Sequence, residues 1–405
     1  MQATNNQKLI LRFFICKIII NLAASFAHPV TPSLIVERNL DSSMFGVALA
    51  AMQTTYFLLA PFWGKLNNYL STRWMMLICC TGYAVGQIVF MSAQTEAVVI
   101  AGRAFSGMFT GGLFTAMLNY LINVSDPETR GKNLTIYATI QTVGSACGYF
   151  IGGMLGTIST ETAFVAQIIT LLVGGVLLCV TSVPDAKGSL RDMQPRQFIK
   201  EANPAAAFLA GRQFMNPAFA LLFALVALAG IGTNAFEQCF NYYIRDQFGL
   251  GSMYNGAIKA VIAVIGVVAN STVCMWLMKK TDIHRSFLPV MVACGAAVLT
   301  ITIPTAVVPY FAIAVVYFAL NTVRTPLVQN MAASRASKEH SNLVMGFYNS
   351  MNSLGGIFGA LFAGLMYNAG PKLPFIFGGC AFLLASLLGA FYIRVSKKYP
   401  LPKAE

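Results

Sequence analysis

Long apolar runs fill this chain, and short polar stretches separate them. A helix that crosses a bilayer needs about 20 mostly apolar residues, because the hydrocarbon layer is roughly 30 Å thick and each residue rises about 1.5 Å. Dividing the chain at charge clusters, acidic gaps and Gly, Pro or Asn turns leaves runs of this length. The pattern predicts twelve membrane-spanning helices, at about 9–35, 44–63, 74–92, 97–123, 133–158, 162–183, 217–243, 254–278, 286–304, 307–331, 343–367 and 373–395.

The composition supports a membrane protein. Of the 405 residues, 57% are hydrophobic and 10% are charged, and the mean hydropathy is +0.66. A typical soluble domain has about 25% charged residues, so a soluble globule is excluded. The nine cysteines are an odd number, lie in predicted spans and lack metal-ligand spacing. We therefore expect small buried hydrophobic side chains there, with neither disulfides nor a metal site.

Positive charge is distributed unevenly around the predicted spans. Of the 27 Lys and Arg, only Arg38, Arg245 and Lys372 lie in the loops of one side, and four lie inside spans. The others occupy the two tails and the alternate loops, so the positive-inside rule places that side and both termini in the cytoplasm. This topology explains the net charge of +13, and no nucleic-acid partner is expected. Arg12 and Lys17 interrupt the first apolar run, so we expect it to stay attached rather than to be removed as a signal peptide.

The chain contains an internal repeat. An offset of about 211 residues aligns glycines of the fifth predicted span with glycines of the eleventh, pairing Gly144, Gly148 and Gly153 with Gly355, Gly359 and Gly364. The sequence thus predicts an all-α membrane protein with two pseudo-symmetric six-helix halves, 1–184 and 215–405, joined by a cytoplasmic linker at 185–214. Duplicated six-span halves are typical of transporters that hold their substrate near the bilayer midplane, where the halves meet.

The loop after the second span, "GKLNNYLSTRW", begins at Gly64 and interrupts the apolar pattern with polar residues. It resembles a loop signature of the major facilitator superfamily, roughly Gly-x3-Asp-x2-Gly-Arg-x-Arg, and the resemblance covers essentially the whole chain. In that family the signature's charges latch one conformation at the cytoplasmic face. Here Asn68 replaces the acid, and Arg73 is the nearest basic residue. We expect a weakened latch in which Arg73 pairs with Asp126 or Glu128 of the next cytoplasmic loop; a plain polar turn is the alternative.

The fourth span contains "RAFSGMFTGG", which begins at Arg103 and resembles the Arg-x3-Gly pattern of the same family. The resemblance implies that this arginine takes part in proton transfer. An arginine near the bilayer centre is costly, so it usually faces a protein interior or a water-filled cavity. Reaching out to the interface, or bracing neighbouring helices, are the alternatives.

The fifth span contains "GSACGYFIGG", which resembles the Gly-x3-Gly-Pro-x2-Gly-Gly signature of the drug:proton antiporter branch, with Tyr149 in place of the proline. Gly144, Gly148 and Gly152, next to Gly153, follow one stripe of a helix and allow another helix to approach closely. The resemblance implies export rather than uptake. Helix packing alone is the simpler interpretation of the stripe.

Glu237 is the single acid that falls inside a predicted span, because the other Asp and Glu lie in loops or tails. It shares a polar stripe with Gly230, Asn234 and Asn241, at spacings of three and four residues. Burial favours the protonated carboxyl, which suits a group that loads and releases a proton. We expect Glu237 and Arg103 to couple transport to protons; an acid that merely reaches interfacial water is the alternative.

Further polar side chains inside the spans are candidates for a substrate cavity or for bridges between helices. They are Gln53, Gln141, Asn234, Asn321, Asn349 and Asn352. Lys17, Lys259 and Arg324 lie closer to the span ends, where long side chains snorkel. If two or more of them face the cavity together with Arg103, the field favours an anionic or zwitterionic substrate.

These features together predict a secondary active transporter that exports a small drug-like molecule or metabolite by proton antiport with alternating access. We expect a monomer in the cell membrane that uses no cofactor and is driven by the proton gradient. One alternative is transport of an anionic metabolite without proton coupling, and another is a non-transporting membrane sensor. An enzyme is not expected, because no P-loop occurs and the three histidines are scattered.

Overall fold

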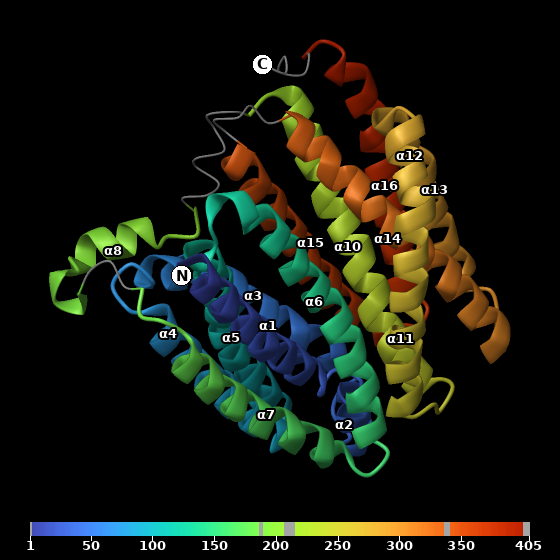
Figure 1. Ribbon diagram of the computed structural model, residues 1–405. Helices are drawn as coiled ribbons and strands as arrows, with labels where there is room; N and C mark the ends of the chain where they lie inside the picture. Colours follow the sequence, from blue (N-terminus) through green and yellow to red (C-terminus); the bar gives the residue numbers. More distant parts are fainter. Residues whose placement is uncertain (1, 186–188, 206–214, 336–340, 400–405) are drawn as a thin grey trace. The chain divides into compact units, whose positions relative to one another are not determined.

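The computed structural model of the chain describes residues 2–185, 189–205, 215–335 and 341–399, and these residues form helices joined by short connections (Figure 1). The all-α prediction is confirmed, and the twelve predicted spans are found as helices. Ten spans are single helices: α3 (Met44–Leu66), α4 (Thr72–Met91), α5 (Glu96–Val124), α6 (Pro127–Leu155), α7 (Thr160–Thr181), α10 (Pro217–Asp246), α13 (Ile283–Thr300), α14 (Val307–Arg335), α15 (Ser341–Tyr367) and α16 (Leu373–Ser396).

Two spans are interrupted. The first consists of α1 (Gln2–Ser25) and α2 (Thr31–Glu37), because Pro32 cannot donate a helical hydrogen bond and starts a new helix instead. The eighth consists of α11 (Ser252–Ala269) and α12 (Met275–Lys280), joined by the π-helical turn η3 (Asn270–Cys274). The prediction of one continuous apolar helix over 9–35 is therefore wrong at the turn between α1 and α2.

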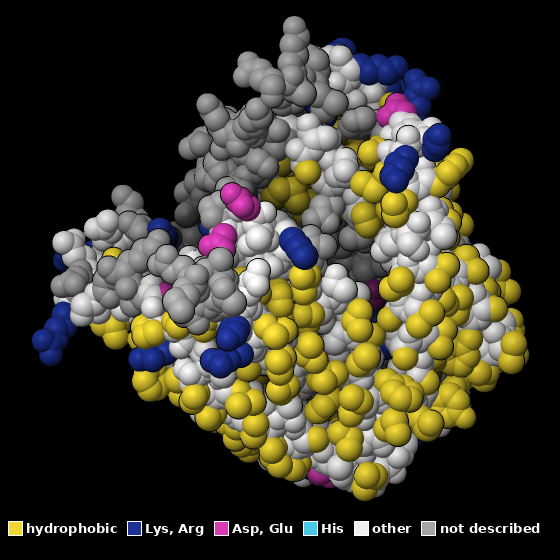
Figure 2. Space-filling model, in the orientation of Figure 1, with side chains coloured by type: hydrophobic (Ala, Val, Ile, Leu, Met, Phe, Trp, Pro, Cys, Tyr) yellow, Lys and Arg dark blue, Asp and Glu magenta, His cyan; other side chains and the backbone are white. Residues whose placement is uncertain are grey.

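Length and apolar composition alone identify eight membrane-crossing helices among the described residues, with α13 as a shorter apolar helix. Helices α1, α6 and α15 carry more polar residues, such as the "PETRGKN" with which α6 begins, so their composition is not apolar enough to identify them in this way. Figure 2 shows apolar side chains covering much of the face in view. Such an exposed apolar surface is expected for a protein whose solvent is lipid.

Between α7 and α10 the structure adds two short elements, η1 (Leu190–Asp192) and α8 (Pro195–Glu201). Two parts of the predicted linker, residues 186–188 and 206–214, lie outside the described residues. The chain divides into two compact units. Unit 1 comprises Met1–Met44, Ala51–Pro204 and Gly249–Ala260, and unit 2 comprises Phe45–Ala50, Ala205–Phe248 and Val261–Glu405.

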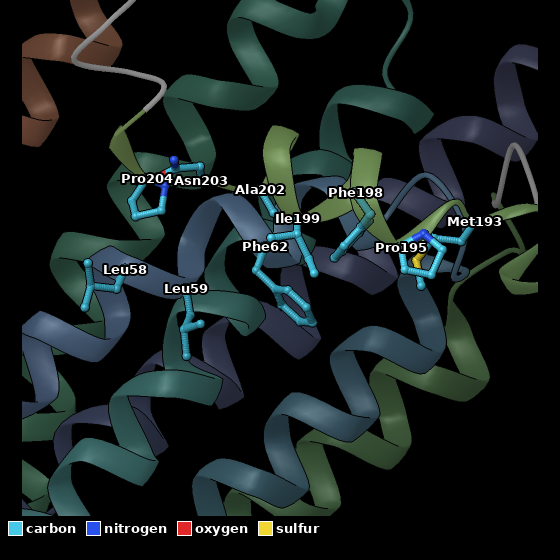
Figure 3. Close-up of a pocket in the computed structure, with 10 residues that line it drawn as sticks. All are labelled: Leu58, Leu59, Phe62, Met193, Pro195, Phe198, Ile199, Ala202, Asn203 and Pro204. Atoms are coloured by element: carbon cyan, nitrogen blue, oxygen red, sulfur yellow. The ribbon is translucent and has the colours of Figure 1, made fainter.

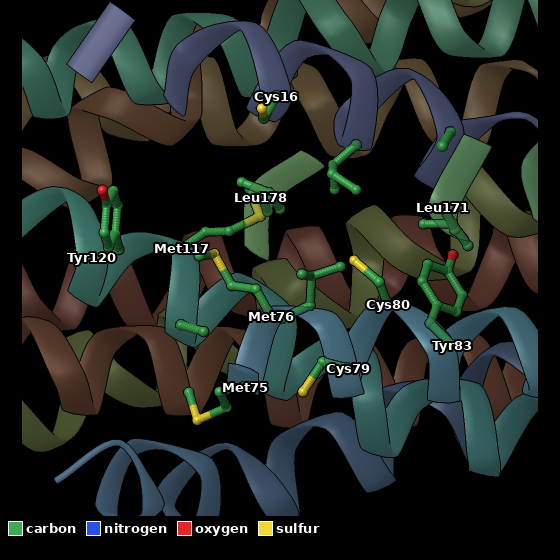
Figure 4. Close-up of a cluster of buried hydrophobic side chains, with 14 of the residues drawn as sticks. Cys16, Met75, Met76, Cys79, Cys80, Tyr83, Met117, Tyr120, Leu171 and Leu178 are labelled. Carbon is green, nitrogen blue, oxygen red and sulfur yellow. The ribbon is translucent and has the colours of Figure 1, made fainter. Parts of the chain in front are cut away.

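Unit 1 has a core rich in sulfur and aromatic side chains where α1, α4, α5 and α7 meet (Figure 4). Cys79 and Cys80 of α4 are fully buried there, next to Tyr83. All nine cysteines are free, and six are buried. The expectation of burial is wrong for Cys147 and Cys380, which are exposed. Membership of a span did not imply burial, because a membrane helix also has an outer face that tolerates a small apolar side chain.

Unit 2 is organised around α10, which packs against α15 and α16. Its core contains an aromatic cluster in which the ring of Phe236 lies 3.9 Å from that of Tyr317 and 5.6 Å from that of Phe375. Phe240 stacks on Tyr310 at 5.7 Å, so the cluster continues along the next turn of α10. This rigid apolar packing holds the polar stripe of α10 in a fixed orientation.

Candidate functional site

The signature loop between α3 and α4 binds an acid that lies 113 residues further along the chain. Asp185, which follows α7, accepts hydrogen bonds from the Thr72 amide at 2.8 Å, from the Thr72 hydroxyl and from the Ser71 hydroxyl at 3.3 Å. Asn123 of α5 donates to the same carboxylate at 3.4 Å. The Thr72 amide is one of the unpaired donors at the start of α4, so Asp185 satisfies the helix end and meets its positive dipole.

The neighbouring asparagine, rather than the one at the signature's acidic position, organises the turn. Asn67 donates to the Thr72 hydroxyl at 2.7 Å and to the Leu70 carbonyl at 3.3 Å, and it accepts from Asn119 at 3.0 Å. Within the part of the chain described, the Asn68 side chain is exposed and makes no hydrogen bond. The loop therefore has an acidic partner, but it is Asp185, which the sequence pattern placed in the linker.

The other predicted latch residues have separate local surroundings. Arg73 lies with its guanidinium carbon 5.5 Å from the Trp74 ring, and its Nε is buried without a hydrogen-bond partner. Asp126 directly precedes α6 at the N-cap position without a side-chain capping hydrogen bond, and Glu128 is exposed in the first turn of that helix. Gly64 has free space, because an added Cβ would meet only Thr115 at 3.9 Å. The pairing of Arg73 with Asp126 or Glu128 stays a prediction.

Arg103 of α5 is buried in unit 1, with 3% of its surface exposed, so it does not snorkel. Its guanidinium donates to the Thr31 hydroxyl of α2 at 2.8 Å, contacts the Met52 sulfur at 3.6 Å and lies 4.0 Å from the Phe90 ring. Its Nε has no hydrogen-bond partner in the part of the chain that the structure describes. The break between α1 and α2 thus places the Thr31 hydroxyl where it can accept a hydrogen bond from Arg103. A guanidinium has five N–H donors, so Arg103 can still donate to a further acceptor.

A second group of side chains in unit 1 surrounds Tyr149 of α6. The ring of His28, in the turn between α1 and α2, stacks on the Tyr149 ring at 5.3 Å. The Lys259 Nζ of α11 lies 5.6 Å from the same ring. His28 is within electrostatic reach of both Arg103 and Lys259, so this end of unit 1 gathers basic groups around one tyrosine. The residue that replaces the family's proline therefore forms an aromatic platform.

The glycine stripe of α6 packs against α1. A Cβ at Gly144 would lie 3.0 Å from the Asn21 side chain, one at Gly148 would lie 2.5 Å from the Leu22 carbonyl, and one at Gly152 would overlap the Phe26 carbonyl. Gly153 points elsewhere, with its Cβ position 2.7 Å from the Ser252 carbonyl of α11. The stripe thus acts as a helix contact, and Gly153 belongs to a different face.

In unit 2, Glu237 is half-buried on α10, one turn after Thr233 and Asn234. Asn234 donates to the Gly230 carbonyl at 3.2 Å, so its amide serves its own helix. The phenol of Tyr317 on α14 is within electrostatic reach of both Glu237 and Arg324. The acid and this arginine therefore influence the same region of unit 2.

Arg324 of α14 has several oxygen acceptors around its guanidinium. Only 6% of its surface is exposed, so it does not snorkel. Its guanidinium donates to Asn321 Oδ1 from two nitrogens, at 3.0 and 2.8 Å, and to the hydroxyls of Thr233 at 3.2 Å and Thr325 at 3.3 Å. Asn321, a predicted cavity residue, is engaged in holding this arginine.

The remaining cavity candidates differ in accessibility. Gln53 is half-buried, whereas Gln141, Asn349 and Asn352 are exposed. Gln141 accepts a hydrogen bond at 3.3 Å from Lys17, which is itself fully buried and therefore does not snorkel. The spacing of four residues from Lys17 to Asn21, which is also buried, would have marked a second polar position on α1, but the sequence pattern gave it no weight.

A separate pocket of about 620 Å³ lies between α3 and α8 (Figure 3). Leu58, Leu59 and Phe62 of α3 line one side, and the linker supplies the other, with the Phe198 ring 5.3 Å from that of Phe62. Its lining contains one polar side chain, Asn203, and no charged group. The pocket therefore offers apolar contact but no means of recognising charge.

Comparison with known proteins places this architecture. The Major Facilitator Superfamily model matches residues 13–323 and 311–405. "Multidrug resistance protein 2" of Bacillus subtilis is 20% identical over 98% of both chains, and "Tetracycline resistance protein, class C" of Escherichia coli is 24% identical over 88% of this chain and 90% of its own. A solved bacterial homolog of the human lysosomal transporter Spinster superposes with a TM-score of 0.81 at 12% identity, covering 98% of this chain and 99% of its own. With nearly the whole sequence matched by one family model, the chain belongs to the Major Facilitator Superfamily.

Proposed function

We propose that this protein is a secondary active transporter that exports small organic molecules in exchange for protons. The observation that carries the proposal is its full-length similarity to proteins named for multidrug and tetracycline resistance. The substrate would be a drug-like compound or a metabolite, and the proton gradient would supply the driving force without a cofactor. The protein would work as a monomer in the cell membrane, with both termini in the cytoplasm.

In alternating access the two six-helix halves, 1–184 and 215–405, would rock against each other around the substrate, with 185–214 as the linker between them. A carboxyl inside the membrane is suited to carrying the coupling proton, because it is neutral when protonated and charged when empty. Glu237 is the acid available for that step in the predicted spans. Loss of its charge on protonation would change its electrostatic interaction with Tyr317, which also interacts with Arg324.

Arg103 supports the same mechanism from unit 1. A permanently charged guanidinium that is 97% buried and holds an unpaired Nε offers a donor for a substrate or a proton-carrying group. In the cytoplasmic latch, Asp185, which binds the start of α4, would take the role of the signature's acid, whose position is occupied here by Asn68. Arg73, Asp126 and Glu128 would complete that latch in the conformation in which they approach one another.

The test is flux driven by a pH gradient in proteoliposomes, comparing wild type with Glu237→Gln. We expect the substitution to abolish gradient-driven flux while exchange of substrate for substrate persists, because only the coupling proton is lost. Glu96→Gln is the matched control, since Glu96 is an exposed acid at the start of α5. Gradient-driven flux that survives Glu237→Gln would overturn the antiport mechanism and favour uncoupled transport of a metabolite.

A further inference from the structure

Lys17 is a charged group enclosed within unit 1. It lies on α1 with no exposed surface, between α5 and α6. Its Nζ is 3.4 Å from the centre of the Tyr137 ring and 5.7 Å from that of Phe114. Gln141 Oε1 accepts its hydrogen bond at 3.3 Å. The ammonium is therefore contacted by a ring face and an amide oxygen.

These partners are neutral, and no described carboxylate forms an ion pair with Lys17. An ammonium has three N–H donors, and one long amide hydrogen bond leaves two of them without an oxygen acceptor. The guanidinium of Arg324, by contrast, donates to two hydroxyl oxygens and to one carboxamide oxygen. Lys17 lacks such a set, although it is more deeply buried.

Asn21 provides a second unsatisfied donor one helical turn along α1. Only 1% of its surface is exposed, and its Nδ2 has no hydrogen-bond partner among the described residues. Residues four apart lie on the same helix face, about 5–6 Å from each other. Gly144 of α6 packs against Asn21, since a Cβ there would lie 3.0 Å from the Asn21 Cβ and 3.9 Å from its Nδ2, so this position brings no side-chain acceptor to the amide. Two unsatisfied N–H groups are thus arranged along one face of α1.

Gln141 connects this buried pair with the accessible surface. It lies one turn before Gly144 on α6, and it is exposed although Lys17 behind it is not. A single hydrogen bond of 3.3 Å separates Lys17 from a group that reaches the surface. A ligand that displaces the Gln141 amide would meet the ammonium first and the Asn21 amide next.

The chemistry of such a ligand follows from the donors. A cation would be repelled by Lys17, and a neutral apolar group would leave both donors unpaired. A carboxylate supplies about four acceptor sites and the opposite charge, so it satisfies both groups at once. We propose that Lys17 and Asn21 on α1, covered by Gln141 on α6, form a subsite for the carboxylate or a similar anionic oxygen group of an organic substrate. This inference rests on the proposed export function and assigns its substrate class.

Binding to the purified full-length protein tests the subsite through thermal unfolding in detergent. The probes are matched pairs with one ring system and opposite charge, 1-naphthoate with 1-naphthylmethylammonium and biphenyl-4-carboxylate with biphenyl-4-methylammonium. We expect the carboxylates to stabilise the wild type. Lys17→Met should weaken their apparent affinity at least tenfold, and Asn21→Leu should weaken it several-fold. Lys17→Arg, which keeps the charge, should retain most of the affinity, and so should Lys279→Met, which removes an exposed charge from α12.

A bracing role for Lys17 predicts a different result. In that case Lys17→Met would lower the unfolding temperature without ligand and would weaken both members of each pair equally, which would overturn the subsite. Our proposal predicts an unliganded stability that is unchanged or higher, because a buried uncompensated charge has been removed. A wild type that no carboxylate stabilises would also overturn it. Failure of the antiport mechanism would appear separately, as gradient-driven flux in Glu237→Gln, and would not alter these binding results.

Discussion

The α1–α6 pair of unit 1 and the α10–α15 pair of unit 2 share one packing arrangement. In unit 1 a Cβ at Gly148 would lie 2.5 Å from the Leu22 carbonyl of α1. In unit 2 a Cβ at Gly359 would lie 2.9 Å from Ile231 Cα of α10. The two glycines are related by the repeat offset, so each unit uses the same position of the same helix to admit a neighbouring backbone.

The chemistry placed on this shared scaffold differs. The first helix of unit 1 carries a buried cation, Lys17, and is interrupted before α2. The corresponding helix of unit 2, α10, runs unbroken from Pro217 to Asp246 and carries the acid Glu237. The packing glycines Gly148 and Gly359 correspond, whereas neither Lys17 nor Glu237 has a charged counterpart in the other repeat. The comparison separates what a repeat needs in order to fold from what each copy contributes to transport.

The largest effect should come from filling the shared glycine contacts. Gly148→Leu and Gly359→Leu should each lower the free energy of unfolding by about 3 kcal/mol, because each side chain would collide with a helix backbone that cannot move aside without breaking its own packing. Thermal unfolding in detergent measures this loss. Gly346→Leu on α15 is the control, since an added Cβ there meets nothing within 4 Å. Equal stability of all three variants would show that the two units do not depend on these contacts.

A smaller difference should separate the two buried arginines. Arg324→Lys should lower the free energy of unfolding by about 2 kcal/mol, because an ammonium cannot bridge Asn321 and Thr233 as the guanidinium does and leaves buried oxygens unpaired. Arg103→Lys should cost less than about 1 kcal/mol, since only the Thr31 hydroxyl loses a bond to oxygen. Chemical unfolding of both variants under one condition measures the difference. The opposite order would mean that Arg103, and not Arg324, is the structural cation.

The long apolar runs were sufficient to predict the helices, because lipid requires long apolar segments with internally paired backbones. The spacing of the glycines showed the repeat, since close helix contacts need glycine at fixed positions. The apolar pattern left undecided whether a basic residue inside a span turns inward. Lys17 and Arg324 were both near enough to a span end to snorkel, yet the rings and amides of neighbouring helices hold them inside.

Contacts between distant segments were beyond the reach of the pattern. Asp185 meets Thr72 across 113 positions of sequence, so the local signature around Asn68 indicated that an acid was missing but not where another one would come from. Asn21 was overlooked for a related reason. The role of an amide side chain inside a span can be inferred only when the neighbouring helix is known. Here that helix is α6, which places Gly144 next to Asn21.

The smallest effect should distinguish how the two units begin equivalent helices. In unit 1 the start of α4 is satisfied by Asp185, which comes from the far end of α7. In unit 2 Asp282 directly precedes α13, its backbone carbonyl accepts the amides of Arg285 and Ser286 at 2.9 Å, and its carboxylate lies 3.6 Å from the Arg285 Nε. Asp185→Ala should lower the free energy of unfolding by about 1 kcal/mol, as for loss of a helix cap, and the exposed Asp282→Ala should cost about half as much.

A double-mutant cycle of Asp185→Ala with Thr72→Val identifies the cause of the larger loss. If the bonds of Asp185 to the Thr72 hydroxyl and amide are responsible, the two changes should be less than additive, because the hydroxyl bond is lost with either substitution. Strict additivity would exclude the hydroxyl bond and leave two causes, the charge of Asp185 and its bond to the Thr72 amide. Asp185→Asn separates them, because it removes the charge and keeps an oxygen acceptor for the amide. If the charge is the cause, Asp185→Asn should be as costly as Asp185→Ala, and raising the salt concentration should reduce the cost, since screening weakens an electrostatic interaction at a helix end but leaves a direct hydrogen bond largely unchanged.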